Sequence, residues 1–236
     1  MASAAESPGA GSTGSQSPGA GSTSSPTAAS PSSPPPPPPP AAHPLARSWS
    51  LLHNRRRGKP QGAGDQLWQA SFTEMCVVSS VESLWAAWPH VPPPSTLNIN
   101  SNLAVFHEGR LPAWEDPVNA RGGCWTLPLP AVRRSGPTAS HALDTAWLSA
   151  VLGAAGGSLD DGVGHVLGVV ASIRKTASRV AVWTADAHAA DAVLEIGARL
   201  RVLWCLGDDD PPLSYQAHDS SASAGSTYAG GALYEI

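Results

Sequence analysis

A helical stripe of hydrophobic residues begins at residue 81. Its members recur at the i, i+3, i+4 and i+7 spacing of one helix face: Val81, Leu84, Trp85 and Trp88. Ser79 and Glu82 have the spacing of a capping box, and Pro89 removes a backbone donor at the other end. The pattern therefore predicts a short helix after residue 79.

Two further segments have helical periodicity. Residues 141–157 carry one apolar face, and Gly156–Gly157 would end that helix. The face comprises Leu143, Trp147, Leu148, Val151 and Leu152. A third helix is expected over residues 187–205, with Asp186 or Thr184 as its cap.

Shorter alternating or apolar runs predict strands. The expected strands are 48–54, 67–78, 97–106, 123–132, 165–175, 178–186 and 213–218, with 165–186 forming a hairpin. Residues 53–66 are basic and then glycine-rich, which is typical of a loop. Because strands outnumber helices and do not alternate strictly with them, we expect an α+β fold with helices packed on one face of a curved antiparallel sheet.

Composition divides the chain into two parts. Residues 1–42 contain mainly Ala, Ser, Gly, Pro and Thr and include seven consecutive prolines at 34–40. Such a segment buries too little apolar surface to offset its ordering entropy, so we expect a disordered tail before one folded domain, 43–236. The sequence shows no secretory signal and no apolar run long enough to span a membrane.

Charge and motif content exclude several classes of function. The net charge of −4 argues against a protein that coats long nucleic acids. Cys76, Cys124 and Cys205 form no C-x-x-C pair, which indicates reduced thiols in the cytosol or nucleus and no zinc site. No common nucleophile, metalloprotease or phosphate-loop motif occurs, so we expect neither an enzyme nor a bound metal or cofactor.

Tryptophan is unusually frequent, with nine Trp against three Tyr and two Phe. Trp68, Trp114 and Trp183 fall at loop or strand ends, where they could form an aromatic stacking site or simply pack in the core. Glu115 follows Trp114 and offers acceptors for the N1–H and N2–H₂ donors of a guanine edge. The side chains suggest a site for a stacked base.

Cations follow the same strand pair. Arg174, Lys175 and Arg179 lie close to Trp183 along the chain and would suit phosphate groups. A stacked base, a carboxylate that reads its edge and a basic hairpin together describe a nucleotide site.

The segments LPAWEDPVNARGGCW, TEMCVVSSVESLWAAWPHV and VASIRKTASRVAVWT resemble the eukaryotic translation initiation factor 4E family, which binds the mRNA cap. The resemblance runs from His43 to the C-terminus and implies an eight-stranded sheet with three long helices on its convex face. It also implies that Trp68 and Trp114 sandwich 7-methylguanine, that Glu115 reads its edge and that Trp183 contacts the methyl group. Arg174 and Arg179, with Lys175 nearby, would meet the triphosphate.

The resemblance further implies a groove on the convex face for partners with a Y-x-x-x-x-L-Φ helix, such as a 4G-type scaffold or 4E-binding proteins. The groove residues would be His43, Pro44, Val81, Trp85, Leu148 and Leu152. Trp85 could instead be a core residue. We expect a monomer that acts in the cytoplasm or also in the nucleus.

Two departures from the family pattern affect these expectations. Cys124 stands where an arginine usually helps to hold the phosphates, and Ser149 stands where an acidic residue usually follows the groove leucine. The function expected from the resemblance is cap-dependent initiation. A cap-binding repressor, a cap-storage paralogue and an interaction module with a decayed cap pocket remain alternatives.

Overall fold

The computed structural model describes residues 42–55, 71–113, 116–219 and 231–236. The expected tail, apart from Ala42, lies outside these residues, and so does most of the expected loop at 53–66. The boundary between tail and domain therefore stays a prediction.

An antiparallel sheet organises the described chain. Its strands are β1 (Pro44–Arg55), β2 (Phe72–Ser80), β3 (Ser101–His107), β4 (Gly123–Pro130), β5 (Val166–Ser172), β6 (Ala177–Thr184), β7 (Ser214–Ala217) and β8 (Tyr234–Glu235). Their order in the sheet is β2-β1-β3-β5-β6-β4-β7-β8, and every neighbouring pair is antiparallel. The expected α+β class and the β5–β6 hairpin are confirmed.

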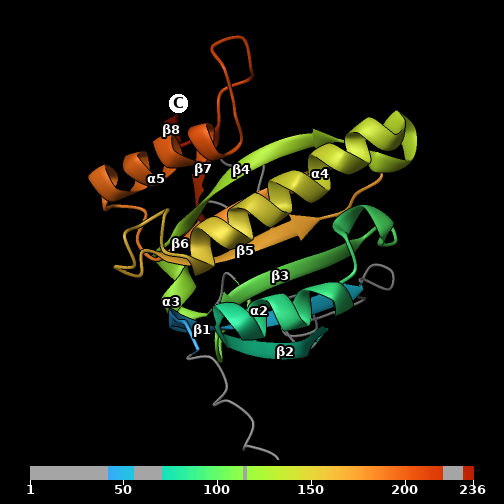
Figure 1. The fold of residues 1–236 in the computed structure, drawn as a ribbon. Coiled ribbons are helices and arrows are strands. Elements are labelled where there is room, and N and C mark those ends of the chain that lie inside the picture. Colours follow the sequence, from blue (N-terminus) through green and yellow to red (C-terminus); the bar gives the residue numbers. More distant parts are fainter. Residues whose placement is uncertain (1–41, 56–70, 114–115, 220–230) are drawn as a thin grey trace, which may run out of the picture. The chain divides into compact units, whose positions relative to one another are not determined.

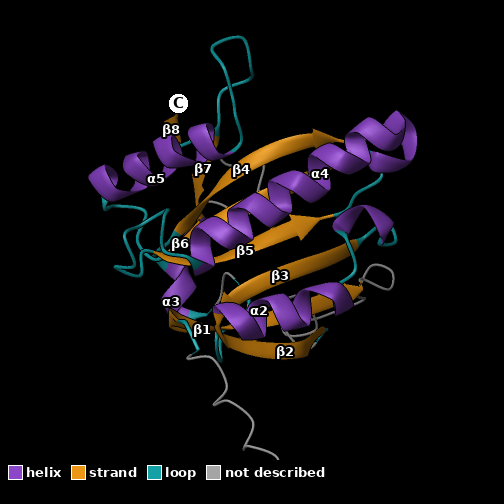
Figure 2. Ribbon diagram, in the orientation of Figure 1, coloured by secondary structure: helices purple, strands orange, loops and turns teal. Residues whose placement is uncertain are grey.

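Helices cover one face of this sheet, as Figures 1 and 2 show. The α-helices are α2 (Val81–Ala87), α3 (Pro117–Ala120), α4 (Val132–Ala155) and α5 (Ala190–Leu203). Two short 3₁₀ helices, Trp88–His90 and Pro94–Thr96, follow α2. Of these, α2, α4 and α5 correspond to the three helices predicted from periodicity. No helix in the described ranges has both the length and the apolar character needed to cross a bilayer.

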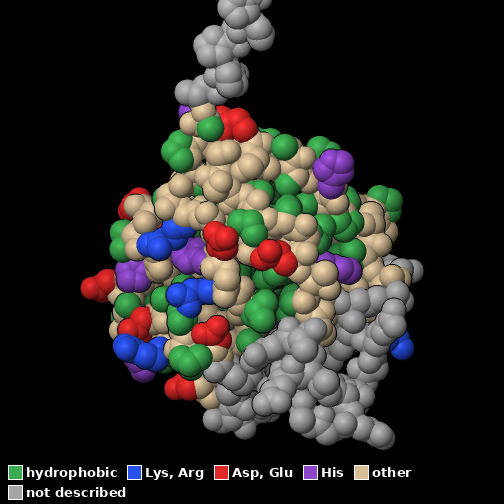
Figure 3. Space-filling view, turned by 90° about the horizontal axis from the view of Figure 1, so that it is seen from below, with side chains coloured by type: hydrophobic (Ala, Val, Ile, Leu, Met, Phe, Trp, Pro, Cys, Tyr) green, Lys and Arg blue, Asp and Glu red, His purple; other side chains and the backbone are tan. Residues whose placement is uncertain are grey.

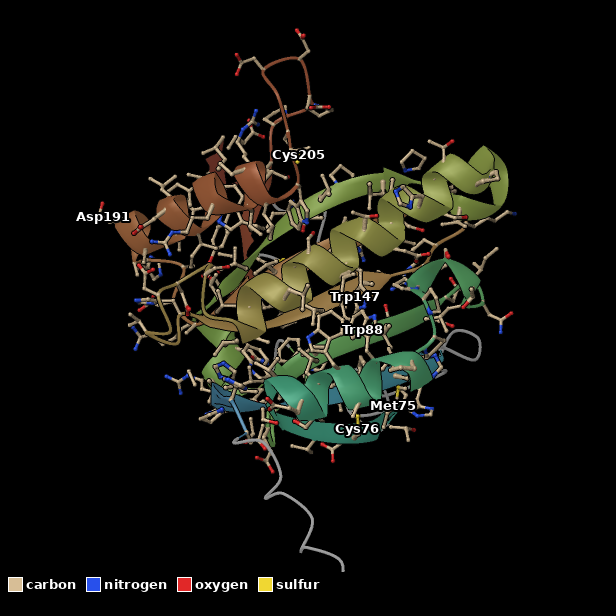
Figure 4. The ribbon with its side chains drawn as sticks, in the orientation of Figure 1. Met75, Cys76, Trp88, Trp147, Asp191 and Cys205 are labelled. Atoms are coloured by element: carbon tan, nitrogen blue, oxygen red, sulfur yellow. The ribbon has the colours of Figure 1, made fainter. Side chains whose placement is uncertain are left out.

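The main core lies between the sheet and the helices that cover one of its faces. It contains the buried indoles of Trp49, Trp125 and Trp147, and Figure 4 shows Trp147 and Trp88 between α4 and α2. Trp125 Nε1 donates to the carbonyl of Val193 on α5 at 2.9 Å. A Cβ on Gly197 would lie 2.5 Å from the Trp125 ring, so only glycine lets α5 approach β4 this closely.

The helix starts differ from their predictions. Ser80, not Ser79, caps α2, because its extended backbone lets its Oγ accept the amide of Ser83 while Ser83 Oγ accepts the amide of Ser80. Glu82 contacts His43 instead of closing a capping box. The capping role predicted for Ser79 and Glu82 is therefore wrong.

Other element boundaries also differ from their predictions. The α4 region begins at Val132 rather than 141, although Gly136, with φ of +74°, interrupts its helical geometry. The start of α5 has no side-chain cap, because Asp186 instead accepts the backbone amide of His188. Residues 213–218 do not hold the last strand, since β8 follows and pairs with β7.

Candidate functional site

The face of the sheet opposite the main core, which we term the open face, carries a second apolar cluster. Its buried members are Leu52, Ala104, Phe106, Cys124, Leu167, Val170, Ala181 and Trp183. They come from strands β1, β3, β4, β5 and β6, so the cluster spans the middle of the sheet. Alternation of side chains along the strands separates most of these residues from the main core. In β5 the register is irregular between Val166 and Gly168, and Leu167 joins Val170 in this cluster.

Trp183 lies within this cluster and is 6% exposed. Its ring meets Phe106 edge-on at 5.5 Å between centroids and lies 4.1 Å from the imidazole of His218. Gly168 is its partner on β5, and a Cβ there would lie 2.3 Å from the Phe106 ring. The missing side chain of Gly168 therefore makes room for the aromatic pair.

The β5–β6 hairpin brings the predicted cations to the same sheet as Trp183. Arg179 is half-buried on β6, two alternations before Trp183, so both side chains point to the open face about 13 Å apart along the strand. Arg174 and Lys175 lie in the turn of the hairpin, where Lys175 is exposed. One hairpin thus carries Trp183, Arg174, Lys175 and Arg179.

Arg174 donates three hydrogen bonds to uncharged groups. Its Nη1 donates to the carbonyls of Ser101 and Ile173 at 3.0 Å each, and its Nη2 donates to Asn102 Oδ1 at 2.7 Å. Asn102 Oδ1 also accepts from Ser172 Oγ at 3.0 Å. These contacts orient the guanidinium beside the end of β3.

The other predicted base-contacting residues, Trp68, Trp114 and Glu115, lie outside the described residues. Their assigned roles therefore stay predictions. The structure does describe the residues that flank 114–115, and these are tightly connected.

Asn119, on α3, connects the residues that follow 114–115 to those that precede them. Its buried amide Nδ2 donates to the carbonyls of Leu111 and Ala113, both at 2.8 Å. On the other side, Asp116 caps the first turn of α3 by accepting the amide of Val118 at 3.0 Å. Asp116 thus has the structural role expected of a helix cap.

Cys124 lies on β4 directly opposite Trp183. Burial raises the pKa of its thiol to about 11, although the hydrogen bond with Thr126 and the charge of Arg179 act the other way. The side chain is therefore an apolar member of the open-face cluster at neutral pH. It supplies no positive charge in place of the arginine usual in the resembled family.

His218 was not predicted as a site residue, although it ends the expected strand 213–218. It is 1% exposed, and neither ring nitrogen has a hydrogen-bond partner among the described residues. Burial lowers its pKa to about 4, so the ring packed against Trp183 is neutral at physiological pH. Asn102 and Asn119 were also missed, because their contacts depend on strand register and loop closure.

The residues predicted to bind a partner gather on the helix-covered side. His43 and Pro44 are exposed at the start of β1, and the amide of Val81 donates to the carbonyl of His43 at 2.9 Å. His43 also contacts Glu82, through its ring Nδ1 at 2.6 Å. The first strand and α2 are thus joined at this surface.

Trp85 is 47% exposed on α2, which contradicts its alternative interpretation as a core residue. Val81 is also exposed, while Leu148 and Leu152 on α4 are half-buried. Figure 3 shows the side of the molecule where α2 and β2 lie, with hydrophobic side chains at the surface among charged and histidine side chains. Partner binding by these residues stays a prediction.

The described residues of this face combine buried aromatic rings, Trp183 and Phe106, with Arg174 and Arg179 of the β5–β6 hairpin. The class defined by the fold is an α+β protein with an eight-stranded antiparallel sheet that helices cover on one face. Residues 44–231 match the model of the family described as eukaryotic initiation factor 4E. The chain belongs to the eukaryotic initiation factor 4E family.

Individual relatives agree with this assignment. Eukaryotic translation initiation factor 4E-1 of Schizosaccharomyces pombe is 35% identical over 187 residues, covering 79% of this chain and 80% of that protein. The factor 4E of Candida albicans is 31% identical over 185 residues, covering 78% and 84%.

Solved structures show the same fold. Ascaris suum eIF4E-3 in complex with the m7G cap is 27% identical, with a TM-score of 0.66 over 75% of this chain and 92% of that one. A schistosome eIF4E complexed with m7GpppA and 4E-BP is 25% identical, with a TM-score of 0.68 over 83% and 99%.

Proposed function

We propose that this chain binds the 7-methylguanosine cap of mRNA on its open face and a helical partner protein on its helix-covered face, as a non-enzymatic factor in translation initiation. The observation that carries the proposal is the β5–β6 hairpin, which places Trp183 and Arg179 on one face with Arg174 at its turn. Support also comes from family members that were solved with a cap.

In this proposal Trp68 and Trp114 cover the two faces of the base, and Glu115 accepts from its N1–H and N2–H₂. Methylation at N7 makes guanine cationic, so indole faces gain cation–π attraction in addition to stacking. Stacking contributes about 1–3 kcal/mol per base and the cation–π interaction about 2 kcal/mol when desolvated. Unmethylated guanine loses the cationic contribution, which gives the site its selectivity.

The neighbours of Trp183 suit a cationic base. The His218 ring beside it is neutral, because burial holds its pKa at about 4, and it therefore does not repel a positively charged ligand. Arg174, Arg179 and Lys175 would contact the phosphates, which also fits a protein whose net charge is −4, because only one RNA end needs to be neutralised.

Retention on immobilised 7-methylguanosine triphosphate tests the cap proposal. We expect the protein to bind, to resist elution by GTP and to elute with free 7-methylguanosine triphosphate. A Trp183→Ala variant should be retained less, while a variant at the distant exposed Val202, Val202→Ala, should behave as the wild type. Failure of the wild type to bind, or equal elution by GTP, would overturn the proposal.

The second binding function rests on the exposure of Trp85 and Val81 beside the His43–Glu82 contact. A partner helix with apolar anchors would cover these side chains and would also contact Leu148 and Leu152 on α4. Ser149 is uncharged, whereas an acidic residue at this position would attract basic residues of the partner. We therefore expect partner binding to depend less on basic residues of the partner than it would with an acidic residue here.

Trp85→Ala tests this surface. Since the indole is half exposed, we expect the melting temperature and cap retention to stay near wild-type values while binding of a Y-x-x-x-x-L-Φ peptide falls at least tenfold. Loss of cap retention together with the fold would instead identify Trp85 as a structural residue. The proteins that co-purify on a cap resin from a cytosolic extract, where we expect the chain to act, would distinguish a scaffold partner from a repressor.

A further inference from the structure

Asn102 is a buried amide near the start of β3. It lies on β3 two and four residues before Ala104 and Phe106, so its side chain points to the open face. It is paired in register with Asn54 on β1 and with Ser172 on β5, and Ser172 is paired with Arg179 on β6. A row of polar side chains therefore crosses four strands and ends at the proposed phosphate-binding cations.

The carbonyl oxygen of Asn102 connects this row to Arg174. Asn102 Oδ1 accepts from Arg174 Nη2 at 2.7 Å and from Ser172 Oγ at 3.0 Å. Because Arg174 Nη1 is held by two backbone carbonyls, the contact with Asn102 fixes the second arm of the guanidinium. The orientation of the planar group is thereby determined.

Packing alone does not explain an amide at this position. Asn102 is fully buried, and its Nδ2 has no hydrogen-bond partner among the described residues. A buried donor without a partner is destabilising, so the role of this amide lies in the two hydrogen bonds that its Oδ1 accepts. The unpaired donor is the consequence of aiming Oδ1 at Arg174 and Ser172.

The absence of charge on Asn102 matters as much as its geometry. A carboxylate at the same place would accept the same two hydrogen bonds but would also neutralise the guanidinium at close range. An amide orients the guanidinium without contributing a negative charge. This difference becomes important in a chain where Cys124 supplies no cation for the phosphates.

We propose that Asn102 is a positioning residue for phosphate recognition, which holds Arg174 in place through an uncharged hydrogen bond and so preserves its attraction for the phosphates of the ligand. The inference rests on the proposed cap-binding function. It concerns the phosphates and not the base, and this separates its test from the test of that function.

Affinities for 7-methylguanosine and its mono-, di- and triphosphates, measured by quenching of tryptophan fluorescence, test the inference. For Asn102→Asp we expect nucleoside affinity within about twofold of the wild type and triphosphate affinity roughly tenfold lower, because a charge-assisted contact is neutralised. Val202→Asp, at an exposed position of α5, adds the same net charge and should leave both values unchanged.

A double-mutant cycle shows whether the effect passes through Arg174. In an Arg174→Gln background, Asn102→Asp should cause little further loss of triphosphate affinity. Should Asn102→Asp fail to fold by circular dichroism, Asn102→Ala replaces it, with an expected loss that again grows with the number of phosphates.

Three results would overturn the inference. One is wild-type triphosphate affinity in Asn102→Asp or Asn102→Ala, another is an equal loss for nucleoside and triphosphate, and the third is an undiminished effect in the Arg174→Gln background. A wild-type protein that binds none of the ligands would overturn the proposed function and this inference with it. Wild-type binding that rises with phosphate number, without an effect of Asn102, would refute the inference alone.

Discussion

Replacing Asn119 with alanine tests whether its hydrogen bonds, which join α3 to the residues before 114, stabilise the protein. The substitution removes two hydrogen bonds of 2.8 Å, from Nδ2 to the carbonyls of Leu111 and Ala113. Each such bond contributes about 0.5–1.5 kcal/mol, and a buried carbonyl left without a donor adds to the loss. Asn119 Oδ1 already lacks a partner among the described residues, so its removal offsets part of this cost.

The net expectation for Asn119→Ala is a loss of about 2 kcal/mol in the free energy of unfolding. For a domain of this size that corresponds to a fall in melting temperature of roughly 4–8 °C, measurable by circular dichroism. Asn98→Ala, at an exposed position, provides the matched control and should stay within about 1 °C of the wild type. We also expect weaker retention on the cap resin, since the flanks of Trp114 and Glu115 would be less restrained.

A melting temperature within 1 °C of the wild type would refute this reasoning, because it would mean that water replaces the amide without cost. A large stability loss with unchanged cap affinity would keep the structural role of Asn119 but separate it from binding.

Three further predictions follow from buried groups. Because burial lowers the pKa of His218 from 6.5 to about 4, the folded state should lose on the order of 3 kcal/mol as the pH falls through 6.5 towards 4. Urea unfolding of the wild type and His218→Phe at pH 7.5 and 4.5 measures this, and an identical pH dependence in the two proteins would contradict it. Gly168→Ala should force the Phe106 ring to move, lower stability by about 1–3 kcal/mol and weaken cap retention; a variant that melts and binds as the wild type would show that the ring has room. In native protein, thiol reagents should modify exposed Cys205 quickly and Cys124 only after unfolding, as intact-mass spectrometry would report; rapid native labelling of Cys124 would disprove its burial.

The helices and hairpin were predictable because their signals are local. The 3.6-residue spacing of hydrophobic residues located α2, α4 and α5, and two apolar runs around a short turn located β5 and β6. The prediction of the α2 cap was wrong because the contact that decides it joins residues far apart in the sequence. Glu82 was assigned to a cap but contacts His43, which lies 39 residues away.

Trp183 and the cations of its hairpin were predictable as a group, because one strand and its turn carry them all. The aromatic environment of Trp183 was not predictable, since Phe106 lies on β3 and His218 follows β7. The exposure of Trp85 was equally undetermined by periodicity, because a residue on an apolar helical stripe can face the core or a partner.

The local elements, the family resemblance and the types of side chain available for base stacking and phosphate contact can all be read from the amino-acid sequence. Which of these side chains meet, and in what electrostatic state, depends on the three-dimensional fold. Asn102 and Ser172 are 70 residues apart, and no local pattern reports that strand register joins them beside Arg174. The physical reason is that hydrogen-bond geometry and burial, which set orientation and pKa, depend on neighbours brought together by the sheet rather than by the chain.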